Sequence, residues 1–270
     1  MDAEPPIYVV GDIHGQMGKL KTLLIAHDLT NEDLGWTGGA SVIWFIGDYL
    51  DRGEAGVEII DVISQLHQQA DRAGGGVRAL LGNHDVTLLA AVKFGDAKSS
   101  GPGGTFRADW ERNGGNPAFM DAVSDRHVGW LSTLPVMQLF HDRLFVHADS
   151  TFYEQYGFSI DEVNEGFRIL LRSDDTKAWD TLLHRFSERE AFHDAAAEGT
   201  ARARTFLERY GGKQIIHGHT PIDKMTGQKP ENVRDALVYA DRLCVNVDGG
   251  MYRGGPGFLY PMVAREPVLL

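Results

Sequence analysis

The residues with the clearest capacity for chemistry are acids, histidines and one amide that directly follow short apolar runs. They are Asp12, His14, Asp48, Asn83, His147, His217, His219 and Asp248. Carboxylate and imidazole groups are the usual ligands of manganese, iron and zinc, and an amide oxygen can fill a further coordination position. A single Asp-Gly ending is most often a turn. Several such endings in one chain instead predict a metal-binding site.

The most informative ending is the stretch 47–53, Gly-Asp-Tyr-Leu-Asp-Arg-Gly. It follows the apolar run 42–46, which has the composition of a buried strand. Two acids and an arginine after such a strand predict a charged site at the carboxyl end of a sheet, where open α/β folds bind ligands. We therefore expect Asp48 to be shared between two metal ions.

Three consecutive strand–motif–helix units must position the first of these residues. The pattern predicts strands over 7–10, 42–46 and 77–81 and helices over 16–26 and 57–69. This β-α-β-α-β order is typical of the α/β class, with a parallel sheet and helices on its faces.

The later part of the chain has a looser pattern. We interpret 93–135 as an insertion or cap and 151–210 as mostly helical, including 163–171 and 191–210. Hairpins are expected over 136–146 and 237–247, with a strand over 214–216 between them. The whole chain, 1–270, is expected to form one domain.

The composition excludes several other classes of protein. A net charge of −12 would repel nucleic acids and anionic membranes, so neither is expected as a partner. No apolar run is long enough to span a membrane, and the acidic stretch 1–6 lacks the apolar region of a secretory signal. The single cysteine, Cys244, fits a reducing compartment. We therefore expect a cytoplasmic protein, and the sequence leaves its oligomeric state open.

Taken together, the motifs resemble those of a known enzyme family. The stretches 11–15, 47–53 and 82–85, spaced by about 35 residues, resemble the signature of the phosphoprotein phosphatase family, which belongs to the calcineurin-like binuclear metallophosphoesterases. The stretches 147–148 and 218–221 resemble its two later histidine motifs. The resemblance implies a bacterial-type serine/threonine phosphatase with a central β-sandwich of two mixed sheets, flanking helices and a small helical cap.

The resemblance also implies a centre of two divalent metal ions, most commonly Mn²⁺, with Fe or Zn as alternatives. The implied ligands are Asp12 and His14 for the first ion, Asp48 for both, and Asn83, His147 and His219 for the second. Relatives with a Gly-His-x-His motif have one further histidine ligand, and Pro221 occupies that position here. His217 is expected to support the ligands rather than to bind metal.

Catalytic roles follow from the same resemblance. A hydroxide that bridges the ions would attack phosphorus in line with the leaving oxygen. Arg52 would hold the phosphate bidentately, and His84 would protonate the leaving group, oriented by Asp51. Alternatively, Asp51 and Arg52 form an ion pair that only holds the loop. The second phosphate-binding arginine is expected to be Arg172, with Arg168 as its competitor.

Two departures from the family pattern remain unassigned. Asp85 stands where members with eukaryotic protein substrates usually have Glu, and Asp149 follows His147 where the usual residues are small. An acid so close to a metal ligand could orient His147 or alter the metal preference, and the sequence does not decide between these roles.

Two substrate classes are consistent with the motifs. The first is a phosphorylated protein or peptide, or a small phosphate ester, cleaved by a serine/threonine or dual-specificity phosphatase. The second is a dinucleoside polyphosphate, hydrolysed by a bis(5'-nucleosyl)-tetraphosphatase-like enzyme that would need a nucleotide-binding cap. The cap residues Phe106, Arg107, Trp110 and Arg112 could stack on a base and contact phosphate, or could form the core of the cap. A non-catalytic binding module would not need the intact ligand set.

Overall fold

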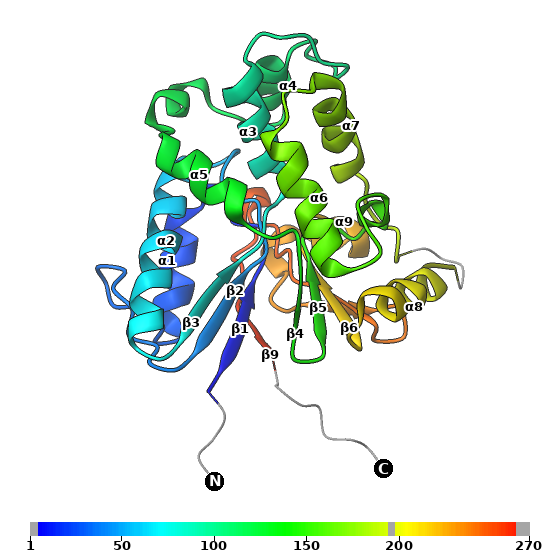
Figure 1. The fold of residues 1–270 in the computed structure, drawn as a ribbon. Coiled ribbons are helices and arrows are strands. Elements are labelled where there is room, and N and C mark those ends of the chain that lie inside the picture. The colour runs from blue at the N-terminus through cyan, green and yellow to red at the C-terminus, as the bar shows by residue number, and fades with distance from the viewer. Residues whose placement is uncertain (1–4, 194–197, 263–270) are drawn as a thin grey trace.

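Two mixed β-sheets form the centre of the chain (Figure 1). A computed structural model describes residues 5–193 and 198–262. In the first sheet, β1 (Ile7–Val10), β2 (Val42–Phe45) and β3 (Gly76–Ala79) run parallel, and β9 (Tyr260–Met262) pairs antiparallel with β1. The predicted parallel arrangement of the first three strands is confirmed.

The second sheet has five strands in the order β4-β5-β6-β8-β7. The strands are β4 (Met137–Phe140), β5 (Arg143–Val146), β6 (Gln214–His217), β7 (Leu237–Tyr239) and β8 (Cys244–Asn246). The β4–β5 and β7–β8 pairs are antiparallel, as predicted for hairpins, whereas β6 runs parallel to both of its neighbours. Both sheets are therefore mixed, as the resemblance implied.

The two sheets share a buried apolar interior. Trp44 of β2 stacks on Phe145 of β5, with ring centroids 4.2 Å apart. Ile43 and Phe45, which flank Trp44, belong instead to the core on the opposite face of the first sheet. A strand buried on both faces is apolar at every position rather than at alternate ones, which explains the unbroken apolar run 42–46.

Helices cover the outer faces of the sheets and one end of the molecule (Figure 1). Helices α1 (Met17–Ala26) and α2 (Gly56–Arg72) lie beside the first sheet, and α6 (Ile160–Arg172) and α8 (Glu198–Tyr210) contact the second. Helix α3 (Asn83–Phe94) packs against both α4 (Phe106–Arg112) and α7 (Thr176–Phe186) at the end of the molecule. The other helices described are α5 (Asp125–Thr133) and α9 (Ile222–Thr226), with the short helices η1 (Pro117–Ala122), η2 (Phe152–Gln155), η3 (Pro230–Asn232) and η4 (Met251–Arg253).

Some elements differ from the sequence-based expectation. The helix predicted over 191–210 begins at Glu198; residues 191–193 are not helical, and 194–197 lie outside the described residues. Strand β9 was not predicted, because three residues that include Pro261 give little local signal and form a strand only by pairing with β1. Among the described residues, no helix has the length and apolarity needed to cross a membrane.

Candidate active site

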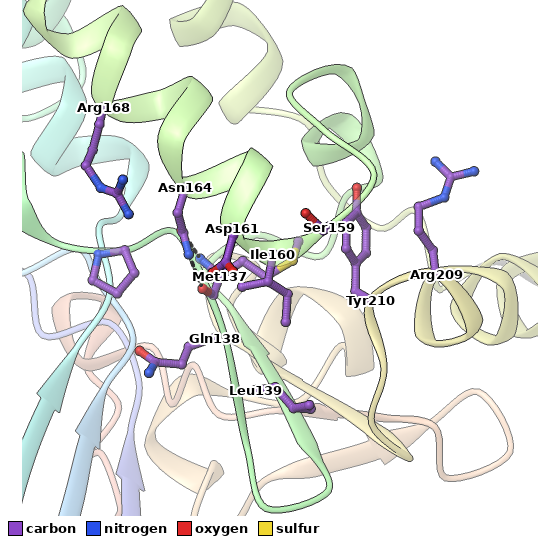
Figure 2. A pocket seen from close by; sticks show the side chains of 11 residues that line it. Met137, Gln138, Leu139, Ser159, Ile160, Asp161, Asn164, Arg168, Arg209 and Tyr210 are labelled. Atoms are coloured by element: carbon purple, nitrogen blue, oxygen red, sulfur yellow. Dashed lines mark hydrogen bonds between the residues drawn. The ribbon is translucent and has the colours of Figure 1, made fainter.

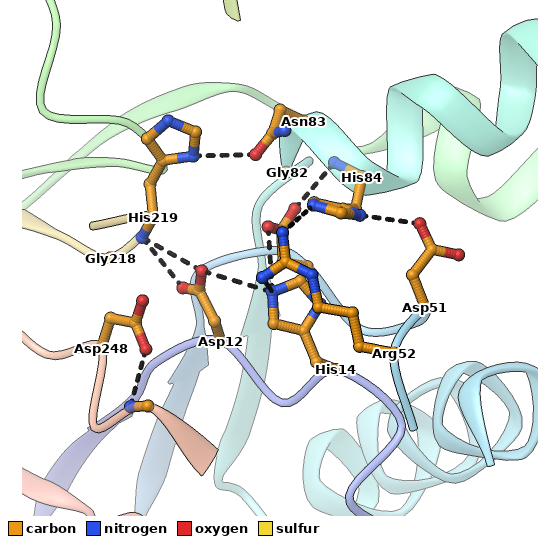
Figure 3. Close-up of polar contacts among 12 residues, drawn as sticks. Asp12, His14, Asp51, Arg52, Gly82, Asn83, His84, Gly218, His219 and Asp248 are labelled. Atoms are coloured by element: carbon orange, nitrogen blue, oxygen red, sulfur yellow. Dashed lines mark hydrogen bonds and ion pairs between the residues drawn. The ribbon is translucent and has the colours of Figure 1, made fainter. Parts of the chain in front are cut away.

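The predicted site residues meet where the carboxyl ends of the strands converge, and Figure 3 shows Asp12, His14, Asn83 and His219 among them. They follow five different strands: Asp12 and His14 follow β1, Asp48 follows β2, Asn83 follows β3, His147 follows β5 and His219 follows β6. All six lie in one region, since each is joined to at least one of the others by a contact of 4.0 Å or less. Residues from both sheets thus contribute to one site.

The backbone of this centre is strained. Several non-glycine residues have positive φ, namely His14 (46°), Asp48 (54°), Asp51 (68°), Arg52 (64°) and His219 (67°). Such conformations cost on the order of 1–3 kcal/mol each and persist only where the surroundings hold them, as they do at functional sites. Gly47 and Gly82 allow the loops to touch, because a Cβ atom on Gly47 would lie 2.6 Å from the Gly82 backbone.

The predicted ligands of the second ion converge on one point. His219 Nδ1 and His147 Nε2 lie 2.8 and 3.1 Å from Asn83 Oδ1, and His147 Nε2 lies 3.4 Å from Asp48 Oδ1. The other ring nitrogen of His147, Nδ1, donates to the carbonyl of Ile46 at 2.7 Å. Such a backbone contact fixes the ring with Nε2 facing inward, as is usual for a metal-binding histidine.

The predicted ligands of the first ion lie next to these. His14 Nε2 is 3.5 Å from Asp48 Oδ2 and 4.0 Å from Asp12 Oδ2, while His14 Nδ1 donates to the Leu50 carbonyl at 3.0 Å. Both carboxylate oxygens of Asp12 accept from the backbone N–H of His219 at 3.1 Å. Asp12 therefore ties the two ligand groups together.

The donor set fits divalent cations. Two groups of described residues, Asp48 with His14 and His84, and Asp48 with His147 and His219, have ligand atoms within 4.8 Å of one another. Burial raises the pKa of Asp12 well above its usual value, and the charge of Asp248 raises it further. Burial would lower the pKa of His147, but Asp48, Asp12 and the carbonyl of Ile46 together outweigh this effect and raise the pKa to about 10. Both pKa shifts indicate that the surroundings of Asp12 and His147 favour a bound positive charge.

His84 and Asp51 form the hydrogen-bonded pair that the motifs predicted. His84 Nδ1 donates to Asp51 Oδ2 at 2.7 Å, and the other oxygen of Asp51 accepts from Trp110 Nε1 at 2.9 Å. The alternative for Asp51, an ion pair with the neighbouring Arg52, is not the arrangement found among the described contacts of its carboxylate. Asp51 therefore orients the ring of His84.

Arg52 points into the site from an exposed position. Its Nη2 donates to His84 Nε2 at 2.8 Å and its Nη1 to His14 Nε2 at 3.2 Å, and its guanidinium lies 4.2 Å from the ring centre of Tyr252. The cap fixes its backbone, because Arg52 N donates to the Gly114 carbonyl at 2.8 Å. Burial lowers the pKa of His84 to about 4, with Arg52 adding to the effect although Asp48 opposes it. A bound phosphate would bring negative charge and raise that pKa again.

Asp85 braces the loops that carry the ligands. Its carboxylate accepts backbone N–H groups of Gly82 at 2.8 Å, Asp48 at 3.0 Å and Tyr49 at 3.2 Å. It is fully buried, and burial raises its pKa to about 7. Asp85, one of the two departures from the family pattern, therefore joins the loop of Asp48 to the loop of Asn83.

Asp149 joins three segments of the site. Its Oδ1 accepts from the hydroxyl of Thr220 at 2.7 Å, and its Oδ2 accepts from Glu190 N at 2.8 Å. Thr220 follows His219, and Glu190 follows Arg189. Asp149, the second departure from the family pattern, thus connects the end of β5 to the loop of His219 and to the segment of Arg189. His217 has its Nε2 2.7 Å from the Tyr239 hydroxyl and its Nδ1 3.0 Å from the carbonyl of Gly218, which precedes His219.

Arg189 lies beside the site and was not considered in the sequence analysis. Its Nη1 donates to the carbonyl of His219 at 2.6 Å, and its charge contributes to lowering the pKa of both His84 and His219, in each case after burial. Arg172 is exposed at the end of α6, where its carbonyl accepts from Lys93, and Arg168 pairs with Glu165. No local pattern distinguishes one arginine among the many of segment 151–210, so only the fold could single out Arg189.

These positions lead to a prediction about phosphate binding. We expect Arg189→Ala to lower kcat/KM by about 10- to 100-fold, because a positioned guanidinium stabilises charge on the phosphate oxygens. Arg172→Ala is the matched control and is expected to change kcat/KM by less than about threefold, as is usual for an exposed charge. Steady-state kinetics of both purified variants would decide, and the reverse ranking would restore Arg172 as the phosphate ligand.

Two hollows lie near or beyond the site. One of about 320 Å³ adjoins Asn83 and is lined by polar residues that include Thr87, Asp109, Asp180 and His184. Another of about 570 Å³ lies between β4, α6 and α8 (Figure 2). In the second hollow the side chain of Asn164 binds both the N–H and the carbonyl of Met137 and so occupies part of the free edge of β4. Of these two hollows, only the first is lined by a predicted metal ligand, Asn83.

Comparison with known proteins agrees with this geometry. The model of the calcineurin-like phosphoesterase family matches residues 5–223. The chain belongs to the calcineurin-like phosphoesterase family. Over 231 residues, this calcineurin-like chain is 26% identical to the symmetrical bis(5'-nucleosyl)-tetraphosphatase of Enterobacter sp. (strain 638), covering 85% of this chain and 72% of that one.

A second relative and a solved structure extend the comparison. Shewanella-like protein phosphatase 2 of Arabidopsis thaliana is 32% identical over 80 residues, which are 30% of this phosphoesterase-family chain but only 20% of the plant protein. The cold-active protein-tyrosine phosphatase of a psychrophile Shewanella sp. shares the fold, with a TM-score of 0.67 at 23% identity, over 95% of this chain and 75% of that one. The relatives thus carry names from both substrate classes considered above.

Proposed function

We propose that this chain is a metal-dependent phosphomonoester hydrolase that removes phosphate from phosphoserine and phosphothreonine in proteins or peptides, using two divalent ions, most commonly Mn²⁺. The observation that carries the proposal is the pair His84–Asp51 beside Arg52, next to Asp48 and the histidines His14, His147 and His219 that lie around it. A proton donor and an anion-binding guanidinium beside such ligands suit hydrolysis of a phosphate ester with a poor leaving group.

Each residue then has a defined task. When bound, the two ions would act as Lewis acids and would lower the pKa of a metal-bound water to about 7. Arg52 turns its two terminal nitrogens from His14 and His84 to the phosphate oxygens, with Arg189 as a second contact on the side of His219. His84, protonated once the phosphate dianion is bound, donates its Nε2 proton to the leaving oxygen while Asp51 holds the ring.

The cap residues support a protein or peptide substrate over a dinucleoside polyphosphate. Phe106 and Trp110 are only 1% and 2% exposed, and the indole of Trp110 is committed to Asp51, so neither can stack on a base. Arg107 lies near Asp96, with Nε 3.4 Å from its carboxylate. Among the described residues, the hollow beside Asn83 is lined by no arginine or lysine and by two aspartates, which suits a peptide better than a chain of phosphates. Phosphotyrosine is a further candidate substrate, and a cytoplasmic location remains a prediction from the single cysteine.

The test is a substrate panel with the Mn²⁺-loaded protein. We expect phosphoserine and phosphothreonine peptides and an aryl phosphate to be hydrolysed, with kcat/KM for the peptides exceeding that for diadenosine tetraphosphate by at least about tenfold. If the tetraphosphate exceeded the peptides by orders of magnitude, the alternative, a hydrolase of dinucleoside polyphosphates, would replace this proposal.

A further inference from the structure

Asp248 is a buried carboxylate that none of these roles uses. It follows β8, is 1% exposed, and accepts a hydrogen bond from Gly250 N through Oδ1 at 2.9 Å. Its other oxygen, Oδ2, is buried and has no hydrogen-bond partner among the described residues. An ionised carboxylate in this state is costly unless a cation or a proton compensates its charge.

The side chain of Asp248 faces the predicted first metal position. Figure 3 shows its carboxylate directed toward Asp12, on the other side of Asp12 from His14. The loop that carries Asp248 is tied to the neighbouring loop of His219, because the Asp248 carbonyl accepts from Ile222 N at 3.1 Å and Val247 N donates to the His217 carbonyl at 2.8 Å. The position of the carboxylate is therefore fixed by the same backbone that fixes the ligands.

The two predicted metal positions are unequal without Asp248. The second has four protein groups, Asp48, Asn83, His147 and His219, whereas the first has only Asp12, His14 and the shared Asp48. A further carboxylate would give the first position four protein groups as well, three of them carboxylates, a set that suits Mn²⁺.

We propose that Asp248 supplies Oδ2 to the metal ion that Asp12, His14 and Asp48 hold. The inference rests on the proposed two-metal centre, and it names one more ligand for that centre. It accounts for the unpaired buried oxygen and for the placement of Asp248 beside Asp12.

Metal titration of the full chain tests the inference without an activity assay. We expect the chelator-stripped wild type to bind two Mn²⁺ by calorimetry. Asp248→Asn is expected to bind one ion as the wild type does and the other at least about tenfold more weakly. Asn resembles a protonated carboxyl in size and charge, so a purely structural acid at this position would leave both affinities unchanged and overturn the inference. Asp223→Asn, which alters a buried acid paired with Arg253 outside the site, is the control and should match the wild type.

A spectroscopic variant keeps the test decisive if Asp248→Asn fails to fold. Asp248→Cys loaded with Co²⁺ is expected to show a thiolate-to-cobalt charge-transfer band, because a thiolate that touches cobalt donates charge to it. The wild type is the blank, since its only cysteine, Cys244, is buried in β8. A folded variant that binds two Co²⁺ without this band would exclude coordination by residue 248. A wild type that bound no Mn²⁺ at all would instead overturn the two-metal centre, and with it the proposed function.

Discussion

Replacement of His84 by Asn should lower kcat by about 10²- to 10⁴-fold with phosphoserine peptides, the range typical of a lost general acid. The leaving alkoxide of serine is strongly basic and needs a proton, whereas an aryl oxide is stable without one. With an aryl phosphate the loss should therefore be much smaller, within about tenfold. The measurement is kcat for both substrates on the wild type and on His84→Asn.

A matched variant distinguishes a loss of catalysis from a loss of folded structure. His127 is also a buried histidine, but it pairs with Asp61 and caps α5 away from the site. His127→Asn should leave kcat for both substrates within about twofold of the wild type, as expected for a position outside the site. Equal losses for the two substrates in His84→Asn would show that His84 only holds the loop, and the proposed proton donation would fail.

Removal of metal should have the largest effect of all. We expect exhaustive chelation to abolish turnover and added Mn²⁺ to restore it, because without cations the chain must bury several carboxylates close together. Each ion should also stabilise the fold, by about 4 kcal/mol when its free concentration is 1,000 times its Kd. Turnover, metal content and thermal unfolding would be measured on the same samples.

The control for metal removal is Asp48→Asn. Asp48 belongs to both ligand groups, so this variant should gain little thermal stability from Mn²⁺. Full turnover in a sample shown to be free of metal would contradict the two-metal centre outright.

The sequence predicted the parts of the site that lie next to strands. A short apolar run followed by an acid, an amide or a histidine is a local signal, and the resemblance to the phosphoprotein phosphatase family implied that Asp12, His14, Asp48, Asn83, His147 and His219 lie together at such strand ends. The pairing of His84 with Asp51 was likewise implied by the family resemblance, and the structure has their hydrogen bond.

The parts that could not be predicted depend on contacts between distant segments. Trp110 could be a surface for a base or a core residue, and only the fold shows its indole bonded to Asp51. Arg189 lies beside the site because the next residue, Glu190, donates its backbone N–H to the carboxylate of Asp149, which is 41 positions away in the sequence. Strand β9 exists only as a partner of β1. Local patterns carry no information about such partners.

The contacts of the cap with the stretch 47–53 have a consequence for how this fold can diversify. Trp110 donates a hydrogen bond to Asp51, and the carbonyl of Gly114 accepts one from the backbone of Arg52, so the cap also positions the groups proposed here to protonate the leaving oxygen and to hold the phosphate. Exchanging this segment for that of a relative would therefore alter acid catalysis together with substrate choice, while the ligands on the sheets stay in place. A replacement segment would therefore need its own donor to Asp51 in place of the indole of Trp110.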